Sequence, residues 1–248
     1  LHAILFVLIG LMPSVFAQNA KIVARKIFPS VVEVTTFNRA GEPDSLGSGF
    51  FVRSDAVITN LHVIEDASSA RISIVGSKTA YDVEGVLGVD RENDLVLLKV
   101  RGLRGKPLSL GDITKVETGQ EIFALGNPRG LEGTISPGIV SGLNLREIGG
   151  AKYIQITAPI SPGSSGGPVV DVTGAVIGVA TRSRQDSQNL NFAIPVTSVA
   201  LLLVDSKGSF LKPISSITVT GPDRRRPDAP PAALSAGTFF RNVVGIDS

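Results

Sequence analysis

The chain has 248 residues, of which 43% are hydrophobic and 19% charged, a composition typical of soluble globular proteins. Its formal net charge of +2 is too small to favour nucleic acid as a partner. The sequence has no cysteine, which excludes disulfides, thiolate nucleophiles and cysteine-ligated metals.

The first 17 residues, L-H-A-I-L-F-V-L-I-G-L-M-P-S-V-F-A, carry no Lys, Arg, Asp or Glu. A short apolar stretch that ends in small residues before Gln18 predicts a secretory signal cleaved after Ala17, although a basic segment at its start is missing. An uncleaved membrane anchor is the alternative. We therefore expect a secreted or periplasmic protein, or a membrane-anchored one if the signal is not cleaved.

Short β-branched runs follow in chain order, each ended by Gly, Pro, Asn or Asp. The first set is V-V-E-V-T-T-F, F-F-V, A-V-I-T, A-R-I-S-I-V, D-V-E-G-V-L-G-V and D-L-V-L-L-K-V. The second set is E-I-F-A-L-G, T-I-S-P-G-I-V-S-G-L, Y-I-Q-I-T, A-V-I-G-V-A and N-F-A-I-P. This spacing predicts an all-β fold. The sets divide near residue 115, which predicts two small β-barrels of about six strands each, over 18–115 and 116–212.

The run V-T-S-V-A-L-L-L-V-D predicts one helix near the end of the second barrel, with Thr197 or Ser198 as its N-cap. Residues 213–248 are rich in Pro, Ala and Arg, and predict a flexible tail.

If cleavage follows Ala17, His62 is the single histidine of the mature chain. A lone histidine is more often structural than catalytic. However, a general base near neutral pH, without cysteine or metal, is most simply an imidazole. No spacing of carboxylates indicates a zinc site around it. We therefore predict that the protein uses no metal and no cofactor.

The stretch S-P-G-S-S-G-G-P, residues 161–168, lies between two runs typical of strands, Y-I-Q-I-T-A-P-I and V-V-D-V-T-G-A-V-I-G-V-A. A serine nucleophile needs a base and fixed donors for the oxyanion that its attack creates. Glycines at 163, 166 and 167 allow backbone amides to turn toward one point beside Ser165. Ser165 is therefore the candidate nucleophile, and an ordinary surface turn is the alternative.

Asp94, in R-E-N-D-L-V-L-L-K-V, stands directly before a strongly apolar strand, a position that delivers a carboxylate to the edge of a core. It is the candidate that orients the imidazole. A turn-capping role is the alternative. Asp66 and Asp90 are competitors, the first too near His62 in sequence to reach back easily and the second in a turn with weaker flanking order.

Five segments occur in order: T-N-L-H-V, N-D-L-V-L-L-K-V, L-G-N-P-R-G-L-E-G-T-I-S-P-G-I-V-S-G-L, S-P-G-S-S-G-G-P and N-F-A-I-P. Over residues 29–204 the chain resembles the trypsin-like serine proteases of the HtrA/Deg family. The order His, Asp, Ser along the chain is that of chymotrypsin-like enzymes. The resemblance implies two perpendicular six-stranded Greek-key β-barrels with the triad in the cleft between them.

The resemblance implies a role for each matching residue. His62 is the general base, Asp94 orients it, and Ser165 is the acylated nucleophile. The backbone N–H groups of Gly163 and Ser165, with that of Ser164 as a further donor, would form the oxyanion hole.

Trypsin-type enzymes with a basic preference carry Asp six residues before the nucleophile, where this chain has Pro159. Together with Ile160, Leu190 and Phe192, Pro159 predicts an apolar pocket for small or medium aliphatic side chains.

Relatives of this family append PDZ domains after the last helix, and the 43 residues after Asp205 are too few for one. We therefore expect a PDZ-less member. The resemblance also implies a homotrimer assembled through N-terminal segments.

These observations together predict a serine endopeptidase that cleaves unfolded or misfolded polypeptides through an acyl-enzyme, with no nucleic acid or metal as partner. One alternative is a catalytically latent chaperone or protein-binding module on the same fold. Another is an esterase, which should instead show G-x-S-x-G between a strand and a helix.

Overall fold

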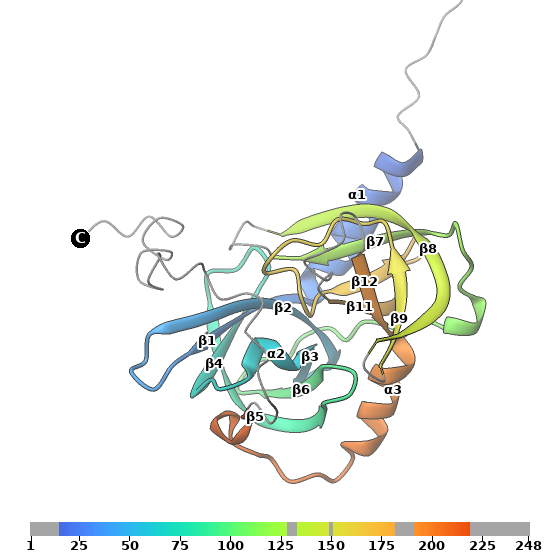
Figure 1. Ribbon diagram of the computed structural model, residues 1–248. Helices are drawn as coiled ribbons and strands as arrows, with labels where there is room; N and C mark the ends of the chain where they lie inside the picture. The colour runs from blue at the N-terminus through green and yellow to red at the C-terminus, as the bar shows by residue number, and fades with distance from the viewer. Residues whose placement is uncertain (1–14, 128–132, 149–150, 182–190, 219–248) are drawn as a thin grey trace, which may run out of the picture.

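The computed structural model describes residues 15–127, 133–148, 151–181 and 191–218 (Figure 1). Within these residues, the strands form two closed six-stranded antiparallel barrels. The strand order is β1-β2-β3-β6-β5-β4 in the first barrel, and the second repeats it as β7-β8-β9-β12-β11-β10. The predicted fold class, two six-stranded β-barrels followed by a short helix, is confirmed.

The strands of the first barrel are β1 (Val31–Phe37), β2 (Pro43–Arg53), β3 (Ala56–Asn60), β4 (Ser69–Ile74), β5 (Ala80–Asp90) and β6 (Leu95–Val100). Those of the second are β7 (Glu121–Gly126), β8 (Thr134–Ile148), β9 (Ala151–Ile156), β10 (Pro168–Asp171), β11 (Val176–Thr181) and β12 (Asn191–Pro195). The run V-V-D-V-T-G-A-V-I-G-V-A is not one strand, because a turn with Gly174 at φ +84° separates β10 from β11.

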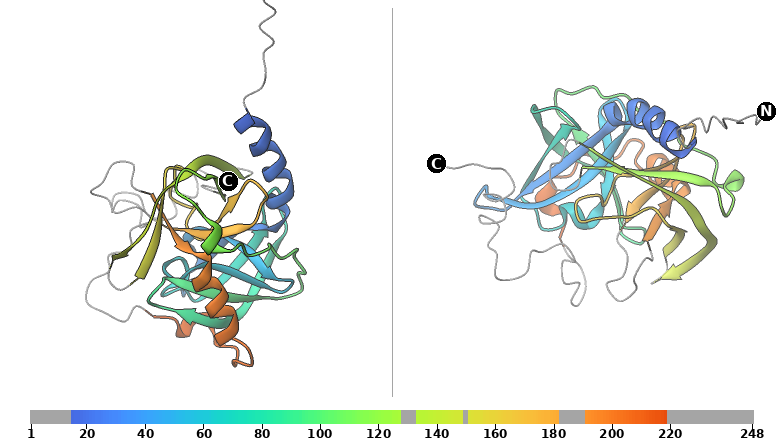
Figure 2. Two further views of the ribbon diagram at one scale, coloured as in Figure 1. Left: turned by 90° about the vertical axis from the view of Figure 1, so that its right-hand side faces the viewer. Right: turned by 90° about the horizontal axis from the view of Figure 1, so that it is seen from above.

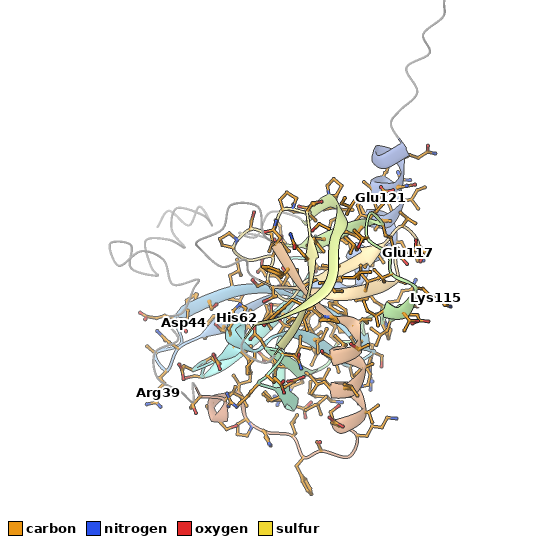
Figure 3. All side chains as sticks on the ribbon, turned by 45° about the vertical axis from the view of Figure 1, so that its right-hand side comes forward. Arg39, Asp44, His62, Lys115, Glu117 and Glu121 are labelled. Atoms are coloured by element: carbon orange, nitrogen blue, oxygen red, sulfur yellow. The ribbon has the colours of Figure 1, made fainter. Side chains whose placement is uncertain are left out.

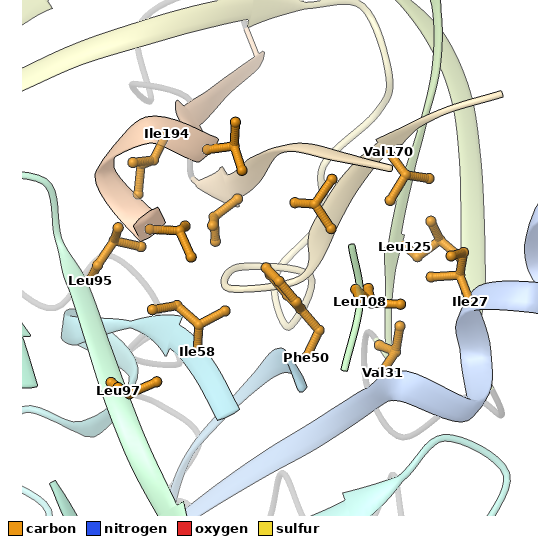
Figure 4. Packing of buried hydrophobic residues seen from close by; sticks show 14 of the residues in the cluster. Ile27, Val31, Phe50, Ile58, Leu95, Leu97, Leu108, Leu125, Val170 and Ile194 are labelled. Atoms are coloured by element: carbon orange, nitrogen blue, oxygen red, sulfur yellow. The ribbon is translucent and has the colours of Figure 1, made fainter. Parts of the chain in front are cut away.

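Several strands bury both of their faces, which explains why their sequences are almost continuously apolar. Successive side chains of a strand point to opposite faces. In β6, Leu95 and Leu97 pack in the core between the barrels, whereas Val96 and Leu98 fill the interior of the first barrel. Figure 4 shows residues of the inter-barrel core contributed by both barrels, by a helix and by the chain between the barrels.

Helix α3 (Val196–Asp205) follows β12 directly and packs against strands of both barrels. The predicted N-cap was wrong. The cap residue is Pro195, and Thr197 and Ser198 lie inside the first turn. Proline fixes its φ near the value at which a strand can bend into a helix, so the helix begins without a side-chain cap.

Helix α1 (Val15–Ile27) precedes the first barrel, and the sequence analysis did not predict it. Its buried residues Val23 and Ile27 are four positions apart on one face and join the inter-barrel core. Figure 2 shows α1 lying along the outside of the barrels. The helix continues across Ala17, the expected cleavage position, which stays a prediction. In the part of the chain that the structure describes, no helix has the length and apolar character needed to span a membrane.

Candidate active site

The register between β3 and β6 places Asp94 beside the start of a short helix, α2 (Leu61–Ile64). Asn60, the last residue of β3, pairs with Leu95, the first residue of β6. The residue before β6 therefore faces the residues after β3. The Asp94 carbonyl accepts hydrogen bonds from the Leu61 amide and the Asn60 side chain, both at 3.0 Å. These contacts hold Asp94 at φ +53°, an uncommon value for a residue other than glycine.

His62 and Asp94 make two direct contacts. His62 Nδ1 lies 2.6 Å from Asp94 Oδ2, and the His62 main-chain amide donates to Oδ1 at 2.9 Å. Both side chains are about one-fifth exposed. Because a carboxylate can only accept, Nδ1 carries the proton in the neutral ring, and Nε2 is then the basic nitrogen. Figure 3 shows His62 on α2.

The competing carboxylates have other surroundings. Asp90 accepts hydrogen bonds from the main chain and the side chain of Asn93, so it caps the turn that leads to Asp94. Asp66 follows α2 with φ +60°, and its amide donates to the Ile217 carbonyl. The structure places the Asp94 carboxylate against the imidazole, and its role in orienting the ring stays a prediction.

The serine loop of the second barrel rests on the first barrel. The Ser48 amide of β2 donates to the Ser165 carbonyl at 2.8 Å. A Cβ on Gly166 would overlap the Ser48 carbonyl and the Thr59 hydroxyl and would lie 3.0 Å from the Asn60 amide, so only glycine allows this approach. Ser165, 3% exposed, is thus next to a residue packed on the end of β3, where α2 begins.

The backbone of this loop determines which amides are free to donate to a substrate oxygen. Gly163 has φ +90°, a conformation that favours glycine. The Ser164 amide, one of the three expected oxyanion donors, donates instead to the Ser161 carbonyl at 2.9 Å. Among the residues that the structure describes, the amides of Gly163 and Ser165 make no hydrogen bond. Buried amides without a partner are rare, so this pair is suited to receive an anionic oxygen.

The expected specificity residues have different environments. Phe192 is buried, and its ring meets that of Tyr153 edge to face, with centroids 6.1 Å apart. Ile160 is half-buried against the core of the second barrel, and Pro159 is exposed. Leu190 lies outside the described residues. The pocket stays a prediction.

Sequence reasoning missed three polar residues next to this site: Glu33, Ser48 and Asn127. Ser48 and Asn127 are buried, and Glu33 is half-buried. Burial raises the pKa of Glu33 above its ordinary value, and hydrogen bonds from Thr35 and Asn127 lower it in part. A serine between two glycines in a buried strand, and a carboxylate inside an apolar strand, were the available signals.

Within the described residues, no group of three or more His, Asp or Glu side chains lies where it could hold a metal ion.

The two six-stranded barrels have the same strand order. The first carries the His62–Asp94 pair, and the serine loop of the second packs beside it. This arrangement defines a chymotrypsin-like architecture. Residues 47–179, more than half of the chain, match the model of the trypsin-like peptidase domain, and the chain belongs to this family. Several relatives are named as Do-like or DegP-like proteases, which confirms the resemblance to the HtrA/Deg group.

The relatives are longer than this chain. Protease Do-like 1, chloroplastic, from Arabidopsis thaliana is 35% identical over 193 residues, covering 69% of this chain and 43% of that protein. The Brucella suis protein named "Probable periplasmic serine endoprotease DegP-like" is 38% identical over 179 residues, covering 67% of this chain and 34% of that protein. The chain thus matches less than half the length of either relative.

A solved structure shares the fold over most of both chains. The active form of the Rv3671c protease from M. tuberculosis superposes with a TM-score of 0.70 and 25% sequence identity. The match covers 82% of this chain and 90% of that one.

Proposed function

We propose that the protein is a serine endopeptidase that cleaves unfolded or misfolded polypeptides through an acyl-enzyme formed on Ser165. The observation that carries the proposal is the His62–Asp94 pair, 2.6 Å apart, at the end of the strand against which the Ser165 loop packs. Family membership and the protease names of the relatives support it.

In the proposed reaction, His62 Nε2 takes the proton from the Ser165 hydroxyl as its oxygen attacks the scissile carbonyl carbon. Asp94 holds Nδ1–H and stabilises the imidazolium that results. The imidazolium then protonates the leaving amine. Water, activated by the same nitrogen, hydrolyses the acyl-enzyme and releases the second product.

The proposed oxyanion hole consists of the amides of Gly163 and Ser165 only, because the Ser164 amide donates to the Ser161 carbonyl. Each such donor contributes about 10²–10³ in turnover in enzymes of this kind.

We propose further that the enzyme prefers small or medium aliphatic side chains before the scissile bond. Pro159, Ile160 and Phe192 carry no charge that would attract a basic side chain. Ile160 packs against the core of the second barrel, and Phe192 is buried. A peptide series varied at this position tests the preference. Faster cleavage after Ala, Val or Leu than after Arg supports it, and the reverse order overturns it.

We propose that the protein acts outside the cytoplasm. The periplasmic and chloroplastic names of its relatives support export, as does the apolar character of residues 1–17. Assembly as a homotrimer remains an expectation from the family resemblance.

Active-site labelling tests the proposed chemistry. A phosphonofluoridate should add one label to the wild-type protein, located on Ser165 by peptide mass mapping, and Ser165→Ala should remain unlabelled and should not hydrolyse casein. Ser161→Ala, which removes an exposed hydroxyl of the same loop, should be labelled normally. Casein hydrolysis by Ser165→Ala would overturn the assignment. A wild-type protein that binds unfolded casein without labelling would favour the latent chaperone.

A further inference from the structure

A chain of polar groups runs from the first barrel to the serine loop. Glu33 Oε2 accepts a hydrogen bond from Asn127 Nδ2 at 2.7 Å. The Asn127 main-chain amide donates to Ser48 Oγ at 2.9 Å, and Ser48 Oγ donates to the Gly163 carbonyl at 2.6 Å. Four segments distant in sequence, β1, β2, the end of β7 and the serine loop, are thereby connected.

Each side chain of this polar network can act only as the donor or acceptor that the observed contacts require. Ser48 is fully buried, and its single hydroxyl proton is used on Gly163. Glu33, when ionised, can only accept, so it fixes which way the Asn127 amide points. The Asn127 side-chain oxygen accepts from the Gly133 amide at 3.2 Å, in agreement with that orientation.

The consequence concerns the loop between Gly163 and Ser165. Ser48 holds two carbonyls of this loop, that of Gly163 through its hydroxyl and that of Ser165 through its amide at 2.8 Å. Because the Ser164 amide donates to Ser161, rotation of the peptide between Gly163 and Ser164 would break two hydrogen bonds, one of them from the buried Ser48 hydroxyl.

We propose that Glu33, Asn127 and Ser48 are positioning residues for catalysis, acting through the Gly163 carbonyl to hold the oxyanion-hole amides in place. The inference rests on the proposed function. It assigns to these residues an effect on turnover rather than on substrate affinity, because their hydrogen bonds lead to the serine loop and Ser48 and Asn127 are buried.

A double-mutant cycle on Glu33 and Asn127 tests the inference. Asn127→Asp places two carboxylates 2.7 Å apart at the Glu33 contact and should disturb the chain. Glu33→Gln keeps an acceptor for Asn127 and should remain within about threefold of wild type in kcat. The double variant Glu33→Gln/Asn127→Asp restores the contact with donor and acceptor exchanged.

The expected pattern is specific to positioning. Asn127→Asp should lower kcat by roughly tenfold to a hundredfold, a part of what loss of an oxyanion donor costs, with KM within about twofold. The double variant should recover kcat to within about threefold of wild type. Recovery by a second substitution separates the contact from any general sensitivity of the site.

Ser48→Ala provides a second variant that does not depend on charge. It should lower kcat and the rate of phosphonofluoridate labelling together, since both reactions need the oxyanion site. A double variant as slow as Asn127→Asp, losses confined to KM, or unchanged labelling of Ser48→Ala would overturn the inference. If Asn127→Asp does not fold, the Ser48→Ala result decides alone.

Failure of this inference differs from failure of the proposed function. If wild-type protein is labelled on Ser165 but the cycle shows no recovery, only the positioning role is wrong. If wild-type protein is not labelled on Ser165, the proposed function is wrong and the cycle has no catalytic meaning.

Discussion

Replacing Asp94 by Asn should disable the proposed base without removing a side chain from the site. In the structure, one Asp94 oxygen accepts from the His62 main-chain amide and the other from the ring Nδ1. An asparagine has one oxygen and one NH₂ group. The main-chain amide can only donate, so it retains the oxygen, and the NH₂ group faces Nδ1.

This orientation reverses the tautomer of the His62 ring. When NH₂ donates to Nδ1, that nitrogen must accept, and the ring proton moves to Nε2. A protonated Nε2 cannot take the proton of the Ser165 hydroxyl. The same substitution in a serine protease triad lowers kcat about 10⁴-fold, which corresponds to about 5 kcal/mol of transition-state stabilisation. We expect a loss of that size here.

The assay is steady-state hydrolysis of an aliphatic peptide ester or amide by the full chain, with the melting temperature measured in parallel. Asp90→Asn is the matched control. Residue 90 lies four positions before Asp94, and an asparagine there keeps an oxygen for the main-chain amide of Asn93. It should change kcat by less than about threefold. Nitrogen NMR of His62 should report a proton on Nδ1 in wild type and on Nε2 in Asp94→Asn. A variant within tenfold of wild type in kcat would refute this reasoning.

Three further predictions concern stability. Burial raises the pKa of Glu33, so the folded state binds this proton more tightly than the unfolded state and stability falls as pH rises through the raised value. Glu33→Gln should therefore raise the melting temperature at about pH 7.5 more than at about pH 4, and an equal shift at both would contradict this prediction. The pKa of Asp55 is lowered below its ordinary value, mainly by a hydrogen bond from Lys99. Asp55→Asn should cost about 1 kcal/mol or less near neutral pH in urea unfolding, and the difference should vanish as pH falls through the lowered pKa; a constant difference would contradict it. Gly166→Ala should cost roughly 3 kcal/mol or more, because its Cβ would overlap the Ser48 carbonyl at φ +89°, whereas Gly208→Ala, at φ +75° in open space, should cost about 1–2 kcal/mol. Equal losses would show that the crowding is relieved.

The strands were predictable because their apolar runs reflect burial on both faces. In β6, all but one residue is buried, and the sequence D-L-V-L-L-K-V marks the strand without help from its partners. Helix α1 was not predicted, because only Val23 and Ile27 of its described side chains are buried, and the exposed Ile22 and the basic residues between them obscure the apolar face. The N-cap of α3 was mispredicted because the end of β12 runs directly into the helix, leaving no turn for a capping side chain.

The candidate triad followed from residue types, since His62 is the single histidine after residue 17 and Ser165 lies in a loop with glycines at 163, 166 and 167. The contact between Asp94 and His62 could also be predicted from the sequence, because Asp94 immediately precedes a clearly apolar strand. The polar chain through Ser48 was not. Its bonds join residues 79, 94 and 115 positions apart, and nothing in the local sequence of Ser48 indicates Gly163 as its partner.

The two halves of the candidate site differ in how they are built, and this difference bears on how activity could be controlled. The His62–Asp94 pair lies wholly within the first barrel and is fixed by the pairing of β3 with β6. The serine loop belongs to the second barrel, yet two of its carbonyls are held by Ser48 of the first. A change that shifts one barrel against the other therefore strains the Ser48 contacts while it leaves the imidazole and its carboxylate together.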